Sequence, residues 1–145
     1  MKPELHTGLT AEIEVTVTKD MLAEFDGEEM QHIYATSALV HHAELAARKL
    51  LVPYLEPQEQ AMTSNIEVSH LMLTVPGMRV KVKAHLREIR DKKIVCDIEA
   101  THVRGKVARG TLTQAIVERA WLENKVKEMS LINQLALQAE AAQKQ

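Results

Sequence analysis

The sequence predicts an α+β fold in which one long helix lies across the apolar face of an antiparallel sheet. Between Glu29 and Arg48 the only charged side chain is Glu44, within an alanine-rich apolar stretch that is typical of a buried helix. After Pro57 the apolar residues recur with period two over roughly sixty residues, which indicates a series of strands. A helix of this kind followed by several strands predicts a helix packed on one sheet.

The first strand is predicted over residues 12–18, where β-branched and polar residues alternate. Ile13, Val15 and Val17 would face the core. Residues 19–32 are acidic and irregular, and we interpret them as a loop or lid with a short helix that ends before Gly27.

The central helix is predicted to begin near Thr36 or Ser37, since both residues are competent N-caps. It should end before Pro53, because the residue that precedes a proline disfavours the α region. The helix would then have about four turns. Its periodicity places Glu44 on the same ridge as its apolar neighbours, pointing inward, where a carboxylate is costly unless it is paired. Alternatively, Glu44 lies at the edge of the apolar stripe and reaches water or a histidine.

Four strands are predicted after the helix, because turn signals at Pro76-Gly77, Asp91-Lys92 and Gly105 divide the alternating region. Connections this short make the strands antiparallel neighbours. From about residue 121 the pattern becomes helical again, with a narrow apolar stripe at Leu122, Val126, Met129, Ile132 and Leu135. We therefore expect a single domain over residues 1–145, with a C-terminal helix and tail over about 121–145.

Composition excludes some classes of partner. The 145 residues contain 18 basic and 20 acidic side chains, and a net charge of −2 gives no electrostatic reason to expect nucleic acid or an anionic membrane. Cys96 is the only cysteine, which fits a reducing compartment, and we expect the cytoplasm. The first residues lack the basic start and apolar core of a signal peptide, and the apolar runs are too short to span a bilayer.

Several segments of this chain, in the same order and with compatible spacing, resemble the fluoroacetyl-CoA thioesterase type of acyl-CoA thioesterase, which has the hot-dog fold. These are Tyr34-Ala-Thr-Ser with Glu44, Val52-Pro-Tyr-Leu-Glu-Pro57, Ile66-Glu-Val-Ser-His70, Val75-Pro-Gly77 with the alternating strand after it, and Glu118-Arg-Ala with Lys125-Val126. The resemblance implies that the family's functional threonine, glutamate and histidine fall on Thr36, Glu44 and His70. It also implies that an antiparallel sheet wraps around one central helix and that the sites form at a dimer interface.

The chain departs from the fluoroacetate enzyme at positions that concern the substrate. That enzyme carries phenylalanines ahead of the helix, whereas this chain has Phe25 and otherwise Met30, His32 and Ile33. That enzyme also has a glycine ahead of the strand that carries the functional histidine, and this chain has Thr63 at the matching position. We therefore expect a short or medium acyl-CoA rather than selectivity for fluoroacetyl-CoA.

The chemistry requires a nucleophile, an oxyanion site and a proton for the leaving thiolate. The amides around Ser37 and Ala38 would supply the oxyanion site at the helix N-terminus, with Thr36 beside them as a hydroxyl donor or a simple cap. Glu44 would act as general base for water or as nucleophile through an anhydride, and the sequence leaves both open. His70 could transfer the proton, although a lone histidine in a strand is also a common structural residue.

Two further groups of residues have alternative interpretations. Arg79 and Lys81 belong to a basic stripe that is either a solvated outer sheet face or a landing site for the phosphates of CoA. His41 and His42, with Glu44 and His70, suggest a metal, but the fold offers one such helix where metal-binding bundles use several, so we predict no metal and no other cofactor.

The predicted function is hydrolysis of an acyl-CoA by a homodimer or a dimer of dimers. A non-catalytic hot-dog module that binds acyl-CoA or acyl carrier protein is the competing interpretation, and a hydratase on the same fold is a third. Retention of all three polar residues favours the enzyme, since a pure binder has no need of a carboxylate on a buried helix face.

Overall fold

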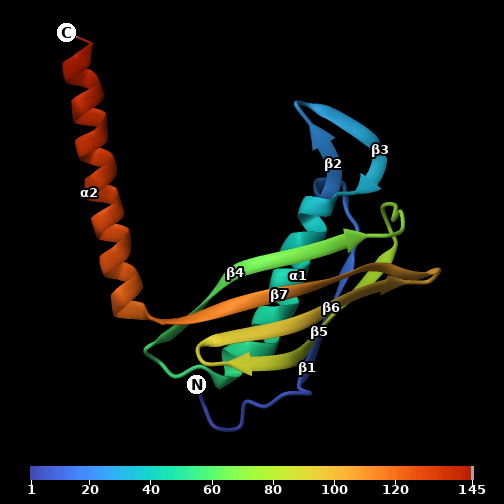
Figure 1. Cartoon of the computed structure of the whole chain (residues 1–145). Coiled ribbons are helices and arrows are strands. Elements are labelled where there is room, and N and C mark those ends of the chain that lie inside the picture. Colours follow the sequence, from blue (N-terminus) through green and yellow to red (C-terminus); the bar gives the residue numbers. More distant parts are fainter. Residues whose placement is uncertain (145) are drawn as a thin grey trace.

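The structure is a computed structural model that describes residues 1–144. Over these residues the chain forms a five-stranded antiparallel sheet with strand order β1-β5-β6-β7-β4, a separate two-stranded sheet, β2-β3, and two long helices (Figure 1). In chain order the elements are β1 (Thr10–Thr16), η1 (Lys19–Met21), β2 (Leu22–Phe25), β3 (Glu28–Tyr34), α1 (Thr36–Leu51), η2 (Val52–Tyr54), β4 (Glu59–His70), β5 (Arg79–Arg90), β6 (Lys93–His102), β7 (Gly105–Glu118) and α2 (Arg119–Gln143).

The core lies between α1 and the concave face of the large sheet. The strands of this sheet curve around α1 (Figure 1). Along β5, buried and exposed residues alternate from Arg79 to Leu86, as the period-two pattern predicts. Three alanines on α1, Ala43, Ala46 and Ala47, are fully buried, and their small side chains let the helix backbone approach the sheet closely. The predicted α+β architecture and the four antiparallel strands after the helix are confirmed.

Residues 19–32 differ from the prediction of a loop. They form η1 and most of a β-hairpin, β2–β3, whose turn is at Asp26-Gly27. Both turn residues have positive φ angles, 52° and 84°, which Asp-Gly adopts readily in a two-residue hairpin turn. The strands are acidic and mostly exposed, so the hairpin lacks the alternation that identifies a strand in a sequence.

The start of the central helix also differs from the prediction. Its N-cap is Ala35, which makes no side-chain capping bond, so neither Thr36 nor Ser37 serves as the cap. The side chain of Thr36 is engaged elsewhere, as described below. The end is as predicted, since α1 stops at Leu51, two residues before Pro53.

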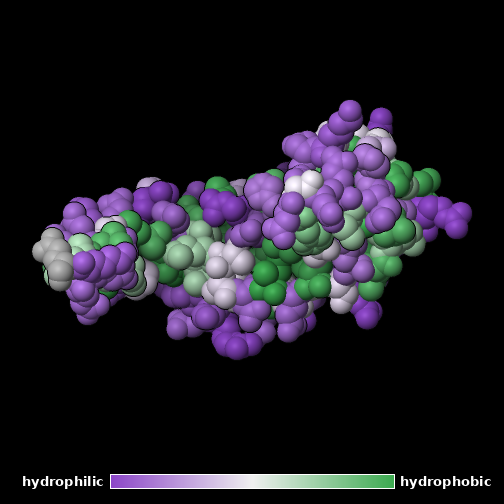
Figure 2. Space-filling view, turned by 90° about the horizontal axis from the view of Figure 1, so that it is seen from above, coloured by the Kyte–Doolittle hydropathy of each residue, from purple (hydrophilic) through white to green (hydrophobic). Residues whose placement is uncertain are grey.

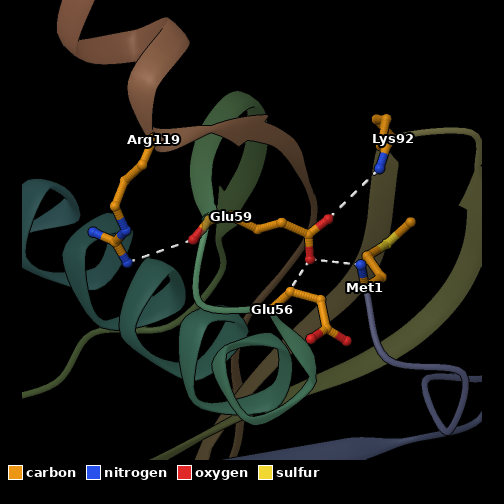
Figure 3. A network of polar contacts seen from close by, with 5 residues as sticks. All are labelled: Met1, Glu56, Glu59, Lys92 and Arg119. Atoms are coloured by element: carbon orange, nitrogen blue, oxygen red, sulfur yellow. Dashed lines mark hydrogen bonds and ion pairs between the residues drawn. The ribbon is translucent and has the colours of Figure 1, made fainter.

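A buried carboxylate, Glu59, ties several distant segments together at the start of β4 (Figure 3). It accepts bonds from the amino terminus of Met1 at 2.5 Å and from the Glu56 amide at 2.9 Å, and Lys92 lies 3.5 Å away. Burial alone would raise the pKa of Glu59, but these bonds and the two positive charges outweigh it and lower the pKa. The guanidinium of Arg119, the first residue of α2, donates to the backbone carbonyl of Glu59 at 3.4 Å.

Helix α2 stands away from the body of the protein (Figure 1). None of residues 119–143 is buried, although the helix carries several large apolar side chains. It begins two residues before the predicted start. Among the described residues, no helix is long and apolar enough to cross a membrane.

Candidate functional site

Thr36 and His70 are brought together although they lie far apart in the sequence. The Thr36 hydroxyl and Nδ1 of His70 are 2.9 Å apart, which joins the first turn of α1 to the last residue of β4. Both residues line a cavity of about 550 Å³. Its other walls are mainly apolar and come from the β2–β3 hairpin and the segment after β4: Ala23, Phe25, Met30, Ile33, Leu71, Met72 and Leu73.

The imidazole of His70 is held in its neutral form. Burial lowers its pKa from the ordinary value, since the charged form loses water. The ring of Tyr34 meets it edge-on, with 6.0 Å between the ring centroids. Nε2 of His70 is buried and has no hydrogen-bond partner among residues 1–144, so this nitrogen is available to a group that enters the cavity.

Tyr34 and His42 form a second buried pair behind this site. The Tyr34 hydroxyl lies 2.5 Å from Nδ1 of His42, and the two rings stack with centroids 5.8 Å apart. Burial raises the pKa of Tyr34 and lowers the pKa of His42. The charge of neighbouring His41 lowers the pKa of His42 further, by a smaller amount. The phenol therefore stays protonated and shares one hydrogen bond with the neutral imidazole of His42. This contact was not predicted, and the available signal was only a tyrosine directly before an apolar helix, where a buried hydroxyl needs a partner.

Glu44 belongs to a separate pair. The Thr63 hydroxyl donates to Oε2 of Glu44 at 2.7 Å, from a point where the register of β4 against β7 shifts. Glu44 is half-buried rather than fully buried, which corrects the expectation that it points into the interior. Within the described protomer it makes no hydrogen bond to Thr36 or His70.

The start of α1 offers donors to an anion. The first hydrogen bond within the helix runs from the Leu39 amide to the Ala35 carbonyl, so the amides of Thr36, Ser37 and Ala38 precede the intrahelical ladder. Ser37 lines the same cavity as Thr36 and His70, whereas Ala38 lines an adjoining hollow beside His41 and His42.

The structure does not bring Arg79 and Lys81 to this cavity. They line another one, of about 590 Å³, together with Glu14, Thr101 and His102. Arg79 lies 3.9 Å from the carboxylate of Glu14. Both basic side chains are on the exposed face of β5.

In the part of the chain that the structure describes, no three side chains of the His, Cys, Asp and Glu types gather in a way that could hold a metal ion. His41 and His42 are neighbours with ring centroids 5.8 Å apart, but they are not joined by a third such group.

An antiparallel sheet wrapped around a central helix is the architecture of the hot-dog proteins. A hypothetical protein from Thermus thermophilus, described as a thioesterase superfamily member, is 30% identical and superposes with a TM-score of 0.88, covering 92% of this chain and 98% of its own. A hot-dog-like protein from Thermanaerovibrio acidaminovorans has a TM-score of 0.79 at 19% identity, covering 88% of this chain and 93% of its own. The predicted hot-dog fold is confirmed.

Within this class the chain belongs to the fluoroacetyl-CoA-specific thioesterase family, whose sequence profile matches residues 17–120. The fluoroacetyl-CoA thioesterase of Streptantibioticus cattleyicolor is 29% identical over 100 residues, which are 69% of this chain and 72% of that protein. The resemblance drawn from the sequence is therefore confirmed.

Proposed function

We propose that the protein hydrolyses a short or medium acyl-CoA to the free acid and CoA. The observation that supports this most directly is the Thr36–His70 pair, which faces an apolar cavity at the donor-rich start of α1. Family membership supports the same reaction class, and structures of a fluoroacetyl-CoA thioesterase hold acetyl-CoA in one case and fluoroacetate with CoA in another.

In this proposal the thioester carbonyl sits at the amides of Ser37 and Ala38, where unpaired donors and the positive end of the helix dipole stabilise the oxyanion. The Thr36 hydroxyl adds a donor at the same place. Glu44 activates water or attacks the carbonyl itself, and His70 delivers a proton to the departing thiolate. If Glu44 acts as general base, it takes the proton of the attacking water, and this proton passes from Glu44 to the neutral His70 before His70 delivers it to the thiolate.

A homodimer would complete this site. β4 is the last strand of the large sheet, and its outer edge has no strand beside it in the described chain. Pairing this edge with a second copy would continue the sheet and satisfy the free backbone groups. It would also bring a second Glu44 toward the Thr36–His70 pair, which Glu44 of the same protomer does not contact. Two such dimers could associate further.

The cavity supports a broader substrate than fluoroacetyl-CoA. Phe25 is 67% exposed at the cavity and does not close over it. Thr63, which we assigned to the substrate, also orients Glu44. Arg79 and Lys81 would act only at a distance, as an electrostatic attraction for the phosphates of CoA.

We also propose that residues 1–145 function as one domain in the cytoplasm. Cys96, the only cysteine, is fully buried and therefore cannot serve a disulfide framework, which supports a reducing compartment.

The test is thiol release from a panel of acyl-CoAs, acetyl through decanoyl and fluoroacetyl, by the wild-type protein and by Glu44→Ala and His70→Ala. Both variants should lose at least 100-fold in kcat/KM, an effect of about 2.7 kcal/mol. Glu12→Ala and His85→Ala serve as matched controls, because these residues are exposed on the same sheet, on strands β1 and β5 away from the β4 edge. They should keep wild-type turnover.

The competing function is a module that binds acyl-CoA or acyl carrier protein without hydrolysis. The separation of Glu44 from the Thr36–His70 pair within a protomer favours it. Saturable binding of acyl-CoA by the folded wild-type protein, with no turnover of any acyl-CoA in the panel, would show that the protein is a binding module and not a thioesterase.

A further inference from the structure

Helix α2 carries several large apolar side chains that the described protomer leaves uncovered. Residues on one arc of the helix include Leu122, Val126, Met129 and Ile132, and the last three are 51–65% exposed. The helix has 25 residues and is therefore about 37 Å long. With a width of about 10 Å, its face amounts to a considerable part of the roughly 800 Å² that each partner buries in a stable interface. An apolar surface of this size indicates a protein contact.

The charges of the helix favour a second copy of this chain over a membrane or nucleic acid. Within α2, three basic residues, Arg119, Lys125 and Lys127, are balanced by three acidic ones, Glu123, Glu128 and Glu140. A helix that lies on an anionic surface carries an excess of lysine and arginine on its polar face. This near balance matches a partner that is itself close to neutral, as this chain is with a net charge of −2.

The base of α2 is fixed next to the open edge of the sheet. Glu118, which precedes the helix, pairs with Glu59, the first residue of β4. Arg119 donates to the carbonyl oxygens of Pro57 and Glu59. From this base the helix rises on the side of the sheet where β4 is the outermost strand (Figure 1).

Pairing of β4 with its copy determines what lies beside that base. When an edge strand pairs in antiparallel fashion with itself about a two-fold axis, the beginning of one strand lies beside the end of the other. Glu59 begins β4 and His70 ends it. The base of α2 in one copy therefore lies next to the His70 end of β4 in the other copy, and the segment after His70 lines the cavity.

The rim of that cavity is itself apolar and exposed. Leu71, Leu73 and Phe25 are 50%, 69% and 67% exposed, and Met30 beside them is 39% exposed. Seen from above, apolar side chains gather both on the body of the molecule and on the helix (Figure 2). Each copy thus carries an uncovered apolar helix and an uncovered apolar rim.

We propose that α2 of one copy covers the cavity rim of the other, so that its apolar arc forms an outer wall of the acyl site. This inference rests on the homodimer of the proposed function and adds a structural role for the last 25 helical residues. It explains how an acyl chain is shielded from water in a cavity whose own phenylalanine stays exposed.

Cross-linking between two differently tagged, co-expressed chains tests this arrangement without relying on activity. One chain carries Met129→Cys and the other Leu73→Cys, and a short bismaleimide joins thiols that lie close together. The native Cys96 should not react, since it is fully buried and burial raises the pKa of its thiol to about 11. The wild-type protein, whose only cysteine is Cys96, is the control for any cross-linking through this residue.

The matched control is Lys127→Cys paired with Leu73→Cys, because residue 127 lies two positions and about 200° away from residue 129 on the helix. We expect the Met129→Cys pair to yield at least fivefold more heterodimer cross-link than the Lys127→Cys pair, with unchanged circular dichroism. Equal yields, a cross-link only between two Met129→Cys helices, or a monomer in sedimentation would overturn the inference. Cross-linking without thiol release from any acyl-CoA would refute the thioesterase but leave the helix contact in place.

Discussion

Glu44 owes its orientation to one hydroxyl. Thr63 donates to its carboxylate at 2.7 Å, and Thr63→Val would remove this donor with little change in volume. A hydrogen bond to a charged group contributes about 1.5–3 kcal/mol. If Glu44 acts as proposed, we expect kcat/KM for the best acyl-CoA to fall about 10- to 100-fold in steady-state thiol release.

Thr111→Val is a suitable control, because Thr111 is a half-buried threonine on the neighbouring strand β7. It should retain the turnover of the wild type. Equal activity of Thr63→Val and Thr111→Val would show that Glu44 needs no orientation by Thr63.

The two buried histidines make stability depend on pH. Burial lowers the folded-state pKa of His42 and of His70 below the ordinary value of 6.5, so the unfolded chain binds more protons as the solution is acidified. The free energy of unfolding should thus be highest above about pH 6.5 and decrease as the pH falls through the lowered values. Urea unfolding at pH 7.5, 6.5 and 5.5 measures this decrease. Glu59 does not interfere, since its lowered pKa confines its effect to pH values below 4.5.

His42→Gln should flatten this pH dependence, because glutamine does not titrate and can still accept a bond from Tyr34. The exposed His85→Gln is the control and should keep the slope of the wild type. An unchanged slope in His42→Gln would mean that His42 is not held in its neutral form in the folded protein.

At the scale of elements, the sequence predicted those parts in which burial repeats regularly. The α1 helix and strands β4 to β7 followed from periodicity and from their proline and glycine boundaries, since one face of each is buried. The β2–β3 hairpin was missed because its residues are mostly exposed, so no alternation marks the strands, although Asp26-Gly27 is a strong hairpin signal.

The site was only partly predictable for a related reason. The resemblance indicated Thr36, Glu44 and His70, but the Thr36–His70 contact joins residues 34 positions apart and depends on how β4 crosses α1. The partners Thr63 for Glu44 and His42 for Tyr34 depend on side-chain packing in the same way. No local pattern in the sequence encodes such contacts.

The pairing of β4 with β7 depends on one glycine. A Cβ atom on Gly110 of β7 would lie 2.0 Å from the carbonyl oxygen of Glu67 and 3.0 Å from Cα of Val68, both in the backbone of β4. Gly110→Ala must therefore push the two strands apart, and overpacking of this kind costs roughly 1–3 kcal/mol. We expect at least about 2 kcal/mol lower unfolding free energy in urea, whereas the exposed neighbour Arg109→Ala should change it by less than about 0.5 kcal/mol.

At the scale of the whole molecule, contacts at the start of β4 link the amino terminus, the β5–β6 turn and the base of α2. Glu59 holds Met1 and Lys92 through its carboxylate and Arg119 through its carbonyl (Figure 3). This junction stiffens the end of the sheet from which α2 rises. The helix therefore projects without packing on its own protomer, and in the proposed homodimer the second copy stabilises it.

A molecule stabilised in this way should unfold at a temperature that depends on its concentration. For a dimer, a 100-fold increase in protein concentration adds about 2.7 kcal/mol, by mass action. Two chains of 145 residues have an unfolding entropy of about 0.6 kcal/mol/K, so Tm should rise by about 4 °C between roughly 1 and 100 µM, measured by circular dichroism. A chain that ends at Glu118 should show a lower Tm at every concentration, because it lacks the contacts of α2. A Tm that stays constant over this range would identify a folded monomer, and both the homodimer and the cap formed by α2 would then be wrong.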